Sequence, residues 1–152
     1  GLAPVGAQAA KASPLMAYRW EHTVAALAAQ LELEAGGHPG VVEPGHAAVR
    51  FTNPATAGDC LSTMRCEMHR LRAGTRTATT RTAGSAVWQV FDGGGVVTVG
   101  KEHWKVGKGD LFAVPSWAPV AITASAESGL DAFRFSDEPV FEALGLARKE
   151  IR

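Results

Sequence analysis

The sequence predicts an all-β domain with flanking helices, a β-sandwich or barrel of the jelly-roll kind. Short apolar runs with turn residues between them follow one another from Met64 to Phe135, at the spacing typical of such folds. Long helices do not alternate with these runs, so a parallel α/β fold is a poor fit. The chain of 152 residues, 46% of them hydrophobic, is long enough for one domain with its own core.

The first 37 residues contain a small, flexible segment and then a helix. Residues 1–12 lack apolar periodicity and are interpreted as a linker or tag remnant, so we expect a domain cut from a longer protein. Residues 13–37 are interpreted as a helical extension with Ser13 as N-cap and Pro14 in the first turn. Its apolar stripe is expected to pack on the core and is formed by Trp20, Val24, Leu27 and Leu31. Gly36 and Gly37 end the helix, while Thr23 is an alternative cap for a second, shorter helix.

Residues 38–136 contain the predicted barrel. Residues 64–71 alternate with period two, which predicts a half-buried strand with Glu67 and His69 on a solvent-facing side. Further strands are expected at residues 85–91, 96–99, 103–106, 111–114, 120–124 and 130–135. Turns are expected between them, among them residues 92–95 and 107–110. Residues 137–152 are interpreted as a C-terminal helical segment, whose Val140, Phe141 and Leu144 pack back on the barrel.

Charge and cysteine content exclude several classes of partner. The chain has 15 Lys+Arg and 15 Asp+Glu without a run of like charge, which argues against nucleic-acid binding. Its longest apolar stretches fall far short of the roughly 20 residues of a membrane helix. Cys60 and Cys66 lack CxxC spacing and could pin only a short loop, so we interpret them as reduced thiols in a cytoplasmic protein.

The five histidines give only a weak metal signal. None of them has HxH, HxxxH or HxxE spacing, and His22 is expected at the surface or an interface. An alternative metal site would have to draw on His38, His46, His69 and His103. The glycines are better explained as turn residues than as phosphate binders. The tryptophans Trp88, Trp104 and Trp117 are expected to fill the barrel or its mouth.

A set of motifs resembles one known family. Gly74, Thr80, Thr82, Gly84 and Gly93, then Gly109-Asp110 and Pro115-Ser116-Trp117, resemble the two glycine-anchored motifs of cupins. Several short sequence segments resemble the C-terminal cupin half of gentisate 1,2-dioxygenases and their hydroxynaphthoate and salicylate relatives. These segments are residues 13–15, 18–21, 51–54, 67–71, 84–87, 109–112, 114–117 and 141–144. The resemblance implies a cupin fold, a double-stranded β-helix. It also implies a parent enzyme in which Fe(II), held by three histidines, cleaves an aromatic ring.

The sequence departs from the metal-binding cupin pattern at the ligand positions. The resemblance places histidines where this chain has Thr80, Thr82 and Val120, and an acidic ligand near Ala86 or Val87. Hydroxyl and alkyl groups are poor ligands for Fe(II). We therefore expect no catalytic residue and no metal ligand in this chain, with Fe(II) in the other cupin half.

Two hypotheses of function follow. In the first, the domain is structural: it supports the N-terminal cupin half of the same protein and forms subunit contacts in a homo-oligomer, with the helix of the apolar stripe as an interface element. In the second, its cavity binds a small aromatic acid. The expected cavity residues are Thr80, Thr82, Gln89 and Val120. Arg76 and Arg81 are candidate carboxylate ligands, although both can equally be solvated loop residues. A metal-independent isomerase would need a buried acid–base pair, which the sequence does not indicate.

Overall fold

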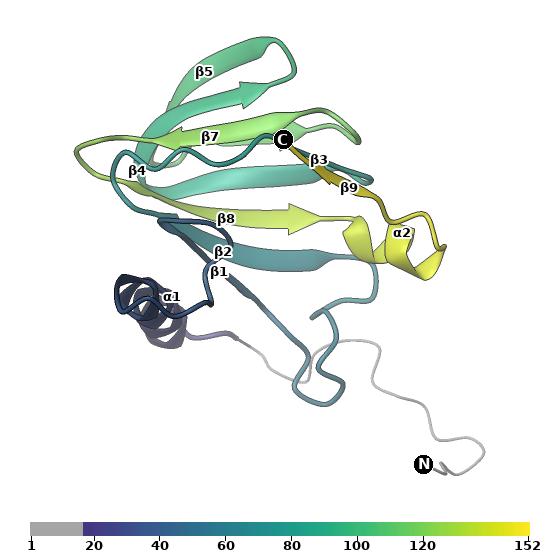
Figure 1. The fold of residues 1–152 in the computed structure, drawn as a ribbon. Helices are drawn as coiled ribbons and strands as arrows, with labels where there is room; N and C mark the ends of the chain where they lie inside the picture. The colour runs from purple at the N-terminus through teal and green to yellow at the C-terminus, as the bar shows by residue number, and fades with distance from the viewer. Residues whose placement is uncertain (1–16) are drawn as a thin grey trace.

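The computed structural model describes residues 17–152, which form a curled β half-barrel with one helix packed on its outside and a shorter helix near its C-terminal end (Figure 1). The elements are α1 (Trp20–Ala35), β1 (His46–Arg50), β2 (Arg65–Leu71), β3 (Thr80–Thr82), β4 (Ala86–Val99), β5 (Glu102–Gly107), β6 (Leu111–Val114), β7 (Val120–Ala124), β8 (Leu130–Ser136), α2 (Glu138–Ala143) and β9 (Lys149–Ile151). The interpretations of residues 1–12 and of Ser13 and Pro14 lie outside the described residues.

The long strand β4 joins two antiparallel sheets. Its first part pairs with β6 and β8, and its second part pairs with β5 and β7. A register shift between Val90 and Asp92 separates the two parts. The expected turn at residues 92–95 is therefore wrong, because these residues lie inside β4. A Cβ on Gly95 would clash with the carbonyl oxygen of Thr123, so glycine here permits close packing of β4 against β7.

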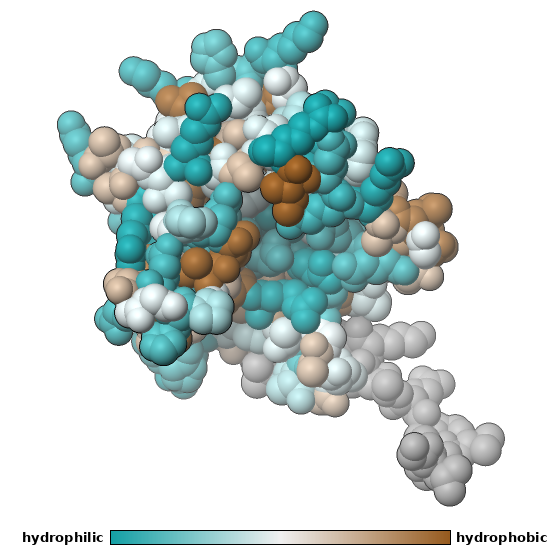
Figure 2. Space-filling view, in the orientation of Figure 1, coloured by the Kyte–Doolittle hydropathy of each residue, from teal (hydrophilic) through white to brown (hydrophobic). Residues whose placement is uncertain are grey.

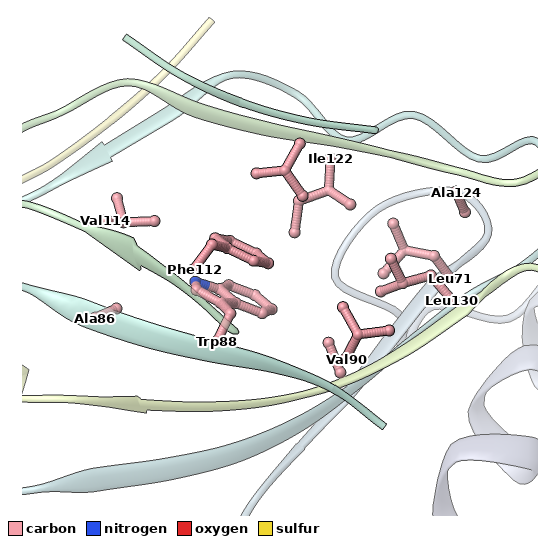
Figure 3. Close-up of a cluster of buried hydrophobic side chains, with 11 residues drawn as sticks. Leu71, Ala86, Trp88, Val90, Phe112, Val114, Ile122, Ala124 and Leu130 are labelled. Atoms are coloured by element: carbon pink, nitrogen blue, oxygen red, sulfur yellow. The ribbon is translucent and has the colours of Figure 1, made fainter. Parts of the chain in front are cut away.

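Inward-facing side chains from both sheets form the main core (Figure 3). Alternate residues of β4 point inward, among them Trp88, Val90 and Val97. Trp88 stacks on Phe112 of β6, with ring centroids 5.9 Å apart and an interplanar angle of 7°. The expectation that Trp88 fills the barrel is thus confirmed, whereas Trp104 is exposed on β5.

Helix α1 packs on the outer face of β1 and β2. Leu27 and Leu31 form a second buried cluster with Ala47 and Met68. The helix begins at Trp20, because Arg19 has an extended backbone (φ −71°, ψ 135°), and it ends at Gly36 as expected. The alternative start at Thr23 is wrong, since Thr23 lies buried inside the helix. No helix of the described residues has the length and apolar character needed to cross a membrane.

The C-terminal segment contains a strand as well as the expected helix. Helix α2 ends at Ala143, and Leu144 is 66% exposed, so the expectation that Leu144 packs on the barrel is wrong. After the helix, β9 pairs with β3 in the register Thr80 to Ile151 and Thr82 to Lys149. The C-terminal segment therefore extends the sheet that contains β3 and β7.

A candidate ligand cavity between the two sheets

A cavity of about 560 Å³ lies between the sheets. Figure 2 shows this face of the molecule hollowed near its centre, with hydrophilic and hydrophobic side chains around the hollow. One wall is polar and contains Glu43, His46, Arg65, Glu67, His69 and Arg134. The other wall is mainly apolar and contains Ala86, Trp88, Val114, Val120 and Ile122. This volume and mixed lining are typical of small-molecule pockets, which measure about 300–1,000 Å³.

The polar wall comes mainly from β2, whose charged face points into the barrel. Arg65 and His69 are buried and Glu67 is half-buried. The expectation that this face meets solvent is wrong. Helix α1 covers the opposite face of β2 through Met68, and the curled sheet encloses the polar side.

Two buried histidines form a hydrogen-bonded pair within this wall. Nε2 of His46 lies 2.9 Å from Nδ1 of His69, and Nδ1 of His46 lies 3.2 Å from Oε1 of Glu43. Burial lowers the pKa of both rings; that of His46 falls to about 4, with the neighbouring His69 adding to the effect and Glu43 opposing it. Both imidazoles are therefore neutral near pH 7.

A chain of ion pairs continues from the histidines to α2. Glu67 pairs with Arg134, and Arg134 pairs with Glu138. Burial raises the pKa of Glu67, but His69 and Arg134 outweigh it and lower the value to about 2. Arg65 contacts Glu138 at 3.1 Å, and it makes bidentate hydrogen bonds to Asp59 and to Glu142. Both guanidinium groups in the polar wall are thus matched by carboxylates.

The structure brings together three of the four residues expected to line a cavity. Thr80 and Val120 are direct cross-strand neighbours, and both line the cavity together with Thr82. Gln89 lies elsewhere: it is exposed on the outer face of β4, because it is one residue out of phase with the inward-facing Trp88.

The two candidate carboxylate ligands also lie outside the cavity lining. Arg76 is exposed and forms an isolated bridge with Thr123. Arg81 is the middle residue of β3, so it alternates with the inward-facing Thr80 and Thr82 and pairs with Glu150 of β9. Neither arginine is among the residues that line the cavity.

Sequence reasoning missed the charged residues that define the polar wall. His46 begins β1, whose sequence His-Ala-Ala-Val-Arg contains only one large apolar residue and was not predicted as a strand. Arg134 lies on β8, whose apolar residues dominated the pattern. The sequence signal for the polar wall was the alternation of Arg65, Glu67 and His69. This alternation is equally compatible with a polar face that lines a cavity and with one that meets solvent.

The cavity lining does not offer a set of ligands that fits iron. Among the described residues, no group of three or more His, Cys, Asp and Glu side chains is placed to hold a metal ion. The ring nitrogens that join His46 and His69 are engaged with each other. The side chains of Thr80, Thr82 and Val120 offer hydroxyl and methyl groups, which do not fit Fe(II).

Comparison with known proteins identifies relatives over nearly the whole chain. The chain is 64% identical over 148 residues to a gentisate 1,2-dioxygenase from a Streptomyces species, and the alignment covers 97% of this chain and 41% of that protein. The crystal structure of a salicylate 1,2-dioxygenase from Pseudaminobacter salicylatoxidans matches with a TM-score of 0.91 and 53% identity, over 99% of this chain and 43% of that one. The chain is homologous to part of the gentisate and salicylate 1,2-dioxygenases. It spans about two-fifths of the length of these dioxygenases.

A more distant structure supports the fold of this dioxygenase homologue. A cupin-2 domain protein from Rhodospirillum rubrum matches with a TM-score of 0.53 at 17% identity, over 61% of this chain. The expected cupin fold is confirmed. No family model matches the chain.

Proposed function

We propose that this chain is the C-terminal, structural cupin half of a gentisate- or salicylate-type 1,2-dioxygenase. In this proposal Fe(II) and ring cleavage belong to the remaining part of the parent enzyme. The observation that carries the proposal is the cavity position of Thr80, Thr82 and Val120, where the resemblance places iron-binding histidines. The chain spans about two-fifths of the length of its relatives, so the remaining three-fifths of a parent enzyme could contain a second cupin half.

Metal analysis and oxygen uptake test this assignment. The chain, purified without a histidine tag and treated anaerobically with Fe(II), is expected to retain less than about a tenth of an equivalent of iron, a level that marks adventitious metal. It is also expected to consume no oxygen with gentisate. The full-length parent enzyme is expected to bind iron and to consume oxygen with gentisate. Stoichiometric iron with oxygen uptake in the chain alone would overturn the proposal.

The structural role requires a contact surface, and the outer face of β4 and β6 supplies one. Phe91 is 46% exposed and Leu111 is 63% exposed on this face. Trp20 of α1 lies against Phe91, with ring centroids 4.4 Å apart. Exposed apolar groups of this kind are typical of interaction sites. The stripe residues Leu27 and Leu31 are not available for this role, since they pack against the chain's own sheet.

We propose that this outer face contacts the N-terminal cupin half or a second copy in a homo-oligomer. Sedimentation of the chain should show self-association that weakens in a Phe91→Ser, Leu111→Ser double variant. Trp104→Ser, at an exposed tryptophan on β5, is the matched control. A strictly monomeric profile of the unaltered chain would contradict an interface between copies.

The free thiols of Cys60 and Cys66 support a cytoplasmic location as part of the same proposal.

A second candidate function is the binding of a small aromatic molecule. It is favoured by the cavity of about 560 Å³, in which Trp88 faces the polar wall of β2. Calorimetric titration of the chain with gentisate and with salicylate tests this candidate. If neither compound nor its uncharged analogue gives a heat of binding, this candidate function is excluded.

A further inference from the structure

The last strand, β9, brings a basic and an apolar side chain to the cavity side of its sheet. It lies at the end of the strand order, next to β3 (Figure 1). Residues directly opposite each other on antiparallel strands share one face of a sheet. Thr80 and Thr82 of β3 line the cavity, so their partners Ile151 and Lys149 face the same side. Ile151 is 62% exposed, which places this part of β9 at the mouth of the cavity.

Two cations at this mouth have no carboxylate partner. Arg148 and Lys149 both line the cavity and are exposed. Within residues 17–152 neither forms a salt bridge, whereas Arg65 and Arg134 of the polar wall each pair with two or more carboxylates. Burial is the largest cause that lowers the pKa of His69, and the positive charges of Arg134 and Lys149 lower it further. The ammonium group of Lys149 therefore acts on the cavity interior.

The guanidinium group of Arg148 is positioned by an unusual turn. It lies over the ring of Trp117, 5.0 Å from the ring centroid. Trp117 has a φ of 65°, in the left-handed region that a bulky side chain rarely adopts. Its backbone N–H donates to the carbonyl oxygen of Thr82 at 2.9 Å, which ties the turn to β3. An arginine stacked on an indole keeps the N–H groups at its edge for a carboxylate, which it can bind in bidentate fashion.

The surface that leads inward from these cations is aliphatic. Val120 is the cross-strand neighbour of Thr80, and Ile122 continues the same face of β7 into the cavity. Trp88 offers little of its ring, because it is 7% exposed and stacked on Phe112. Methyl groups of this kind fit an extended alkyl chain better than a flat ring.

We propose that the cavity mouth binds an aliphatic carboxylate, whose charged group lies between Arg148 and Lys149 and whose alkyl chain runs inward along Val120. This ligand class rests on the second candidate function above, the binding of a small molecule in the cavity. It replaces an aromatic ligand by an aliphatic one. It is independent of the structural role of the chain.

The two isoleucines of the chain report on this site. Ile122 lies on the apolar wall and Ile151 lies at the mouth, so methyl labelling of isoleucine gives one NMR signal for each place. Octanoate, kept below its micelle concentration, should saturate at one equivalent and shift both signals. The uncharged 1-octanol has the same chain and should bind about tenfold more weakly. Equal binding of the two compounds, or octanoate binding that leaves either signal in place, would overturn the proposal.

A double variant and its matched control test the two cations. Arg148→Gln with Lys149→Gln removes both charges and should weaken octanoate binding about tenfold, with the binding of 1-octanol unchanged. Arg81→Gln with Lys101→Gln removes the same two charges elsewhere. Arg81 alternates with the inward-facing residues of β3, and Lys101 lies in the turn between β4 and β5. Unchanged octanoate binding in the first variant, or an equal loss in the control, would overturn the proposal.

Titration with gentisate and salicylate separates this proposal from the candidate on which it rests. Binding of either compound with no binding of octanoate would refute the aliphatic site and leave an aromatic-acid site. Silence with all four compounds would refute both, and would leave the structural role untouched.

Discussion

The buried His46 ring couples the stability of this domain to pH. Its pKa is about 4 in the folded protein, against 6.5 for an unburied histidine. Between these values the unfolded chain binds a proton that the folded protein excludes, so the free energy of unfolding falls as the pH drops from 6.5 to 4. The loss from this ring is at most about 3 kcal/mol. His69, whose pKa is also lowered, acts in the same direction.

Urea unfolding at a series of pH values measures this effect. His46→Gln should flatten the decline between pH 6.5 and 4, because the variant has no ring to protonate in the unfolded chain. His103→Gln, at an exposed position, should retain the full decline. An equal slope in the His46 variant and in the unaltered chain would contradict the account.

At the scale of elements, helix α1 is held to the sheet by one side of its surface. Leu27 is fully buried against Ala47 and Met68, whereas Leu33 is 50% exposed on the same helix. Leu27→Ala should lower the free energy of unfolding by about 2–5 kcal/mol, through lost burial and the cavity left behind. Leu33→Ala should change it by less than about 0.5 kcal/mol. Similar losses in both variants would show that the helix does not dock as described.

The interior of β4 depends on a glycine where it crosses β7. Gly95→Ala should destabilise the domain by more than about 2 kcal/mol, because the new methyl group meets the backbone of Thr123. Gly107→Ala on the neighbouring strand β5 is the control, since its Cβ would have open space. Thermal unfolding of both variants compares the two positions, and equal melting temperatures would contradict the close packing.

These elements also show how far the sequence could predict the fold. Alternation located β2, short apolar runs between turn residues located β5 to β8, and the resemblance to cupins assigned the architecture. The same reasoning missed β3 and β9, because strands of three residues carry too little periodicity to be recognised and form through pairing with each other. It divided β4 at Gly93 to Gly95, since glycine runs signal turns in sequence and close strand approach in space.

The site was predictable only in part, for a related reason. Thr80, Thr82 and Val120 could be placed in one cavity through the cupin motif. The partners of His69 and Glu67 could not. His46 lies 23 residues from His69 and Arg134 lies 67 residues from Glu67 in sequence, and strand pairing brings them together. Alternation alone does not distinguish a polar face that meets water from one that lines a cavity.

At the scale of the whole molecule, Arg65 ties three separate parts of the chain together, and a fourth joins them through Glu138. From β2 it reaches Asp59 in the preceding loop, and Glu138 and Glu142 on α2, while Glu138 also binds Arg134 of β8. Its side chain is 11% exposed, and its loss removes a cation from three carboxylates, of which Glu138 keeps Arg134 and Asp59 keeps Arg50 at 3.9 Å. Arg65→Met should therefore cost about 3 kcal/mol and loosen the packing of α2 on the barrel. The loop and helix should lose protection against hydrogen exchange ahead of the sheets.

Arg70 provides the comparison that isolates this role. It makes a bidentate pair with Asp131, its direct neighbour on β8, and connects only two adjacent strands of one sheet. Its side chain is 25% exposed, so Arg70→Met should cost less, about 1 kcal/mol, and leave hydrogen exchange in α2 unchanged. If both variants lose the same stability and α2 keeps its protection in each, Arg65 pairs locally. If only Arg65→Met exposes α2, the ion-pair chain along the polar wall holds the C-terminal segment against the barrel and so helps to close the cavity.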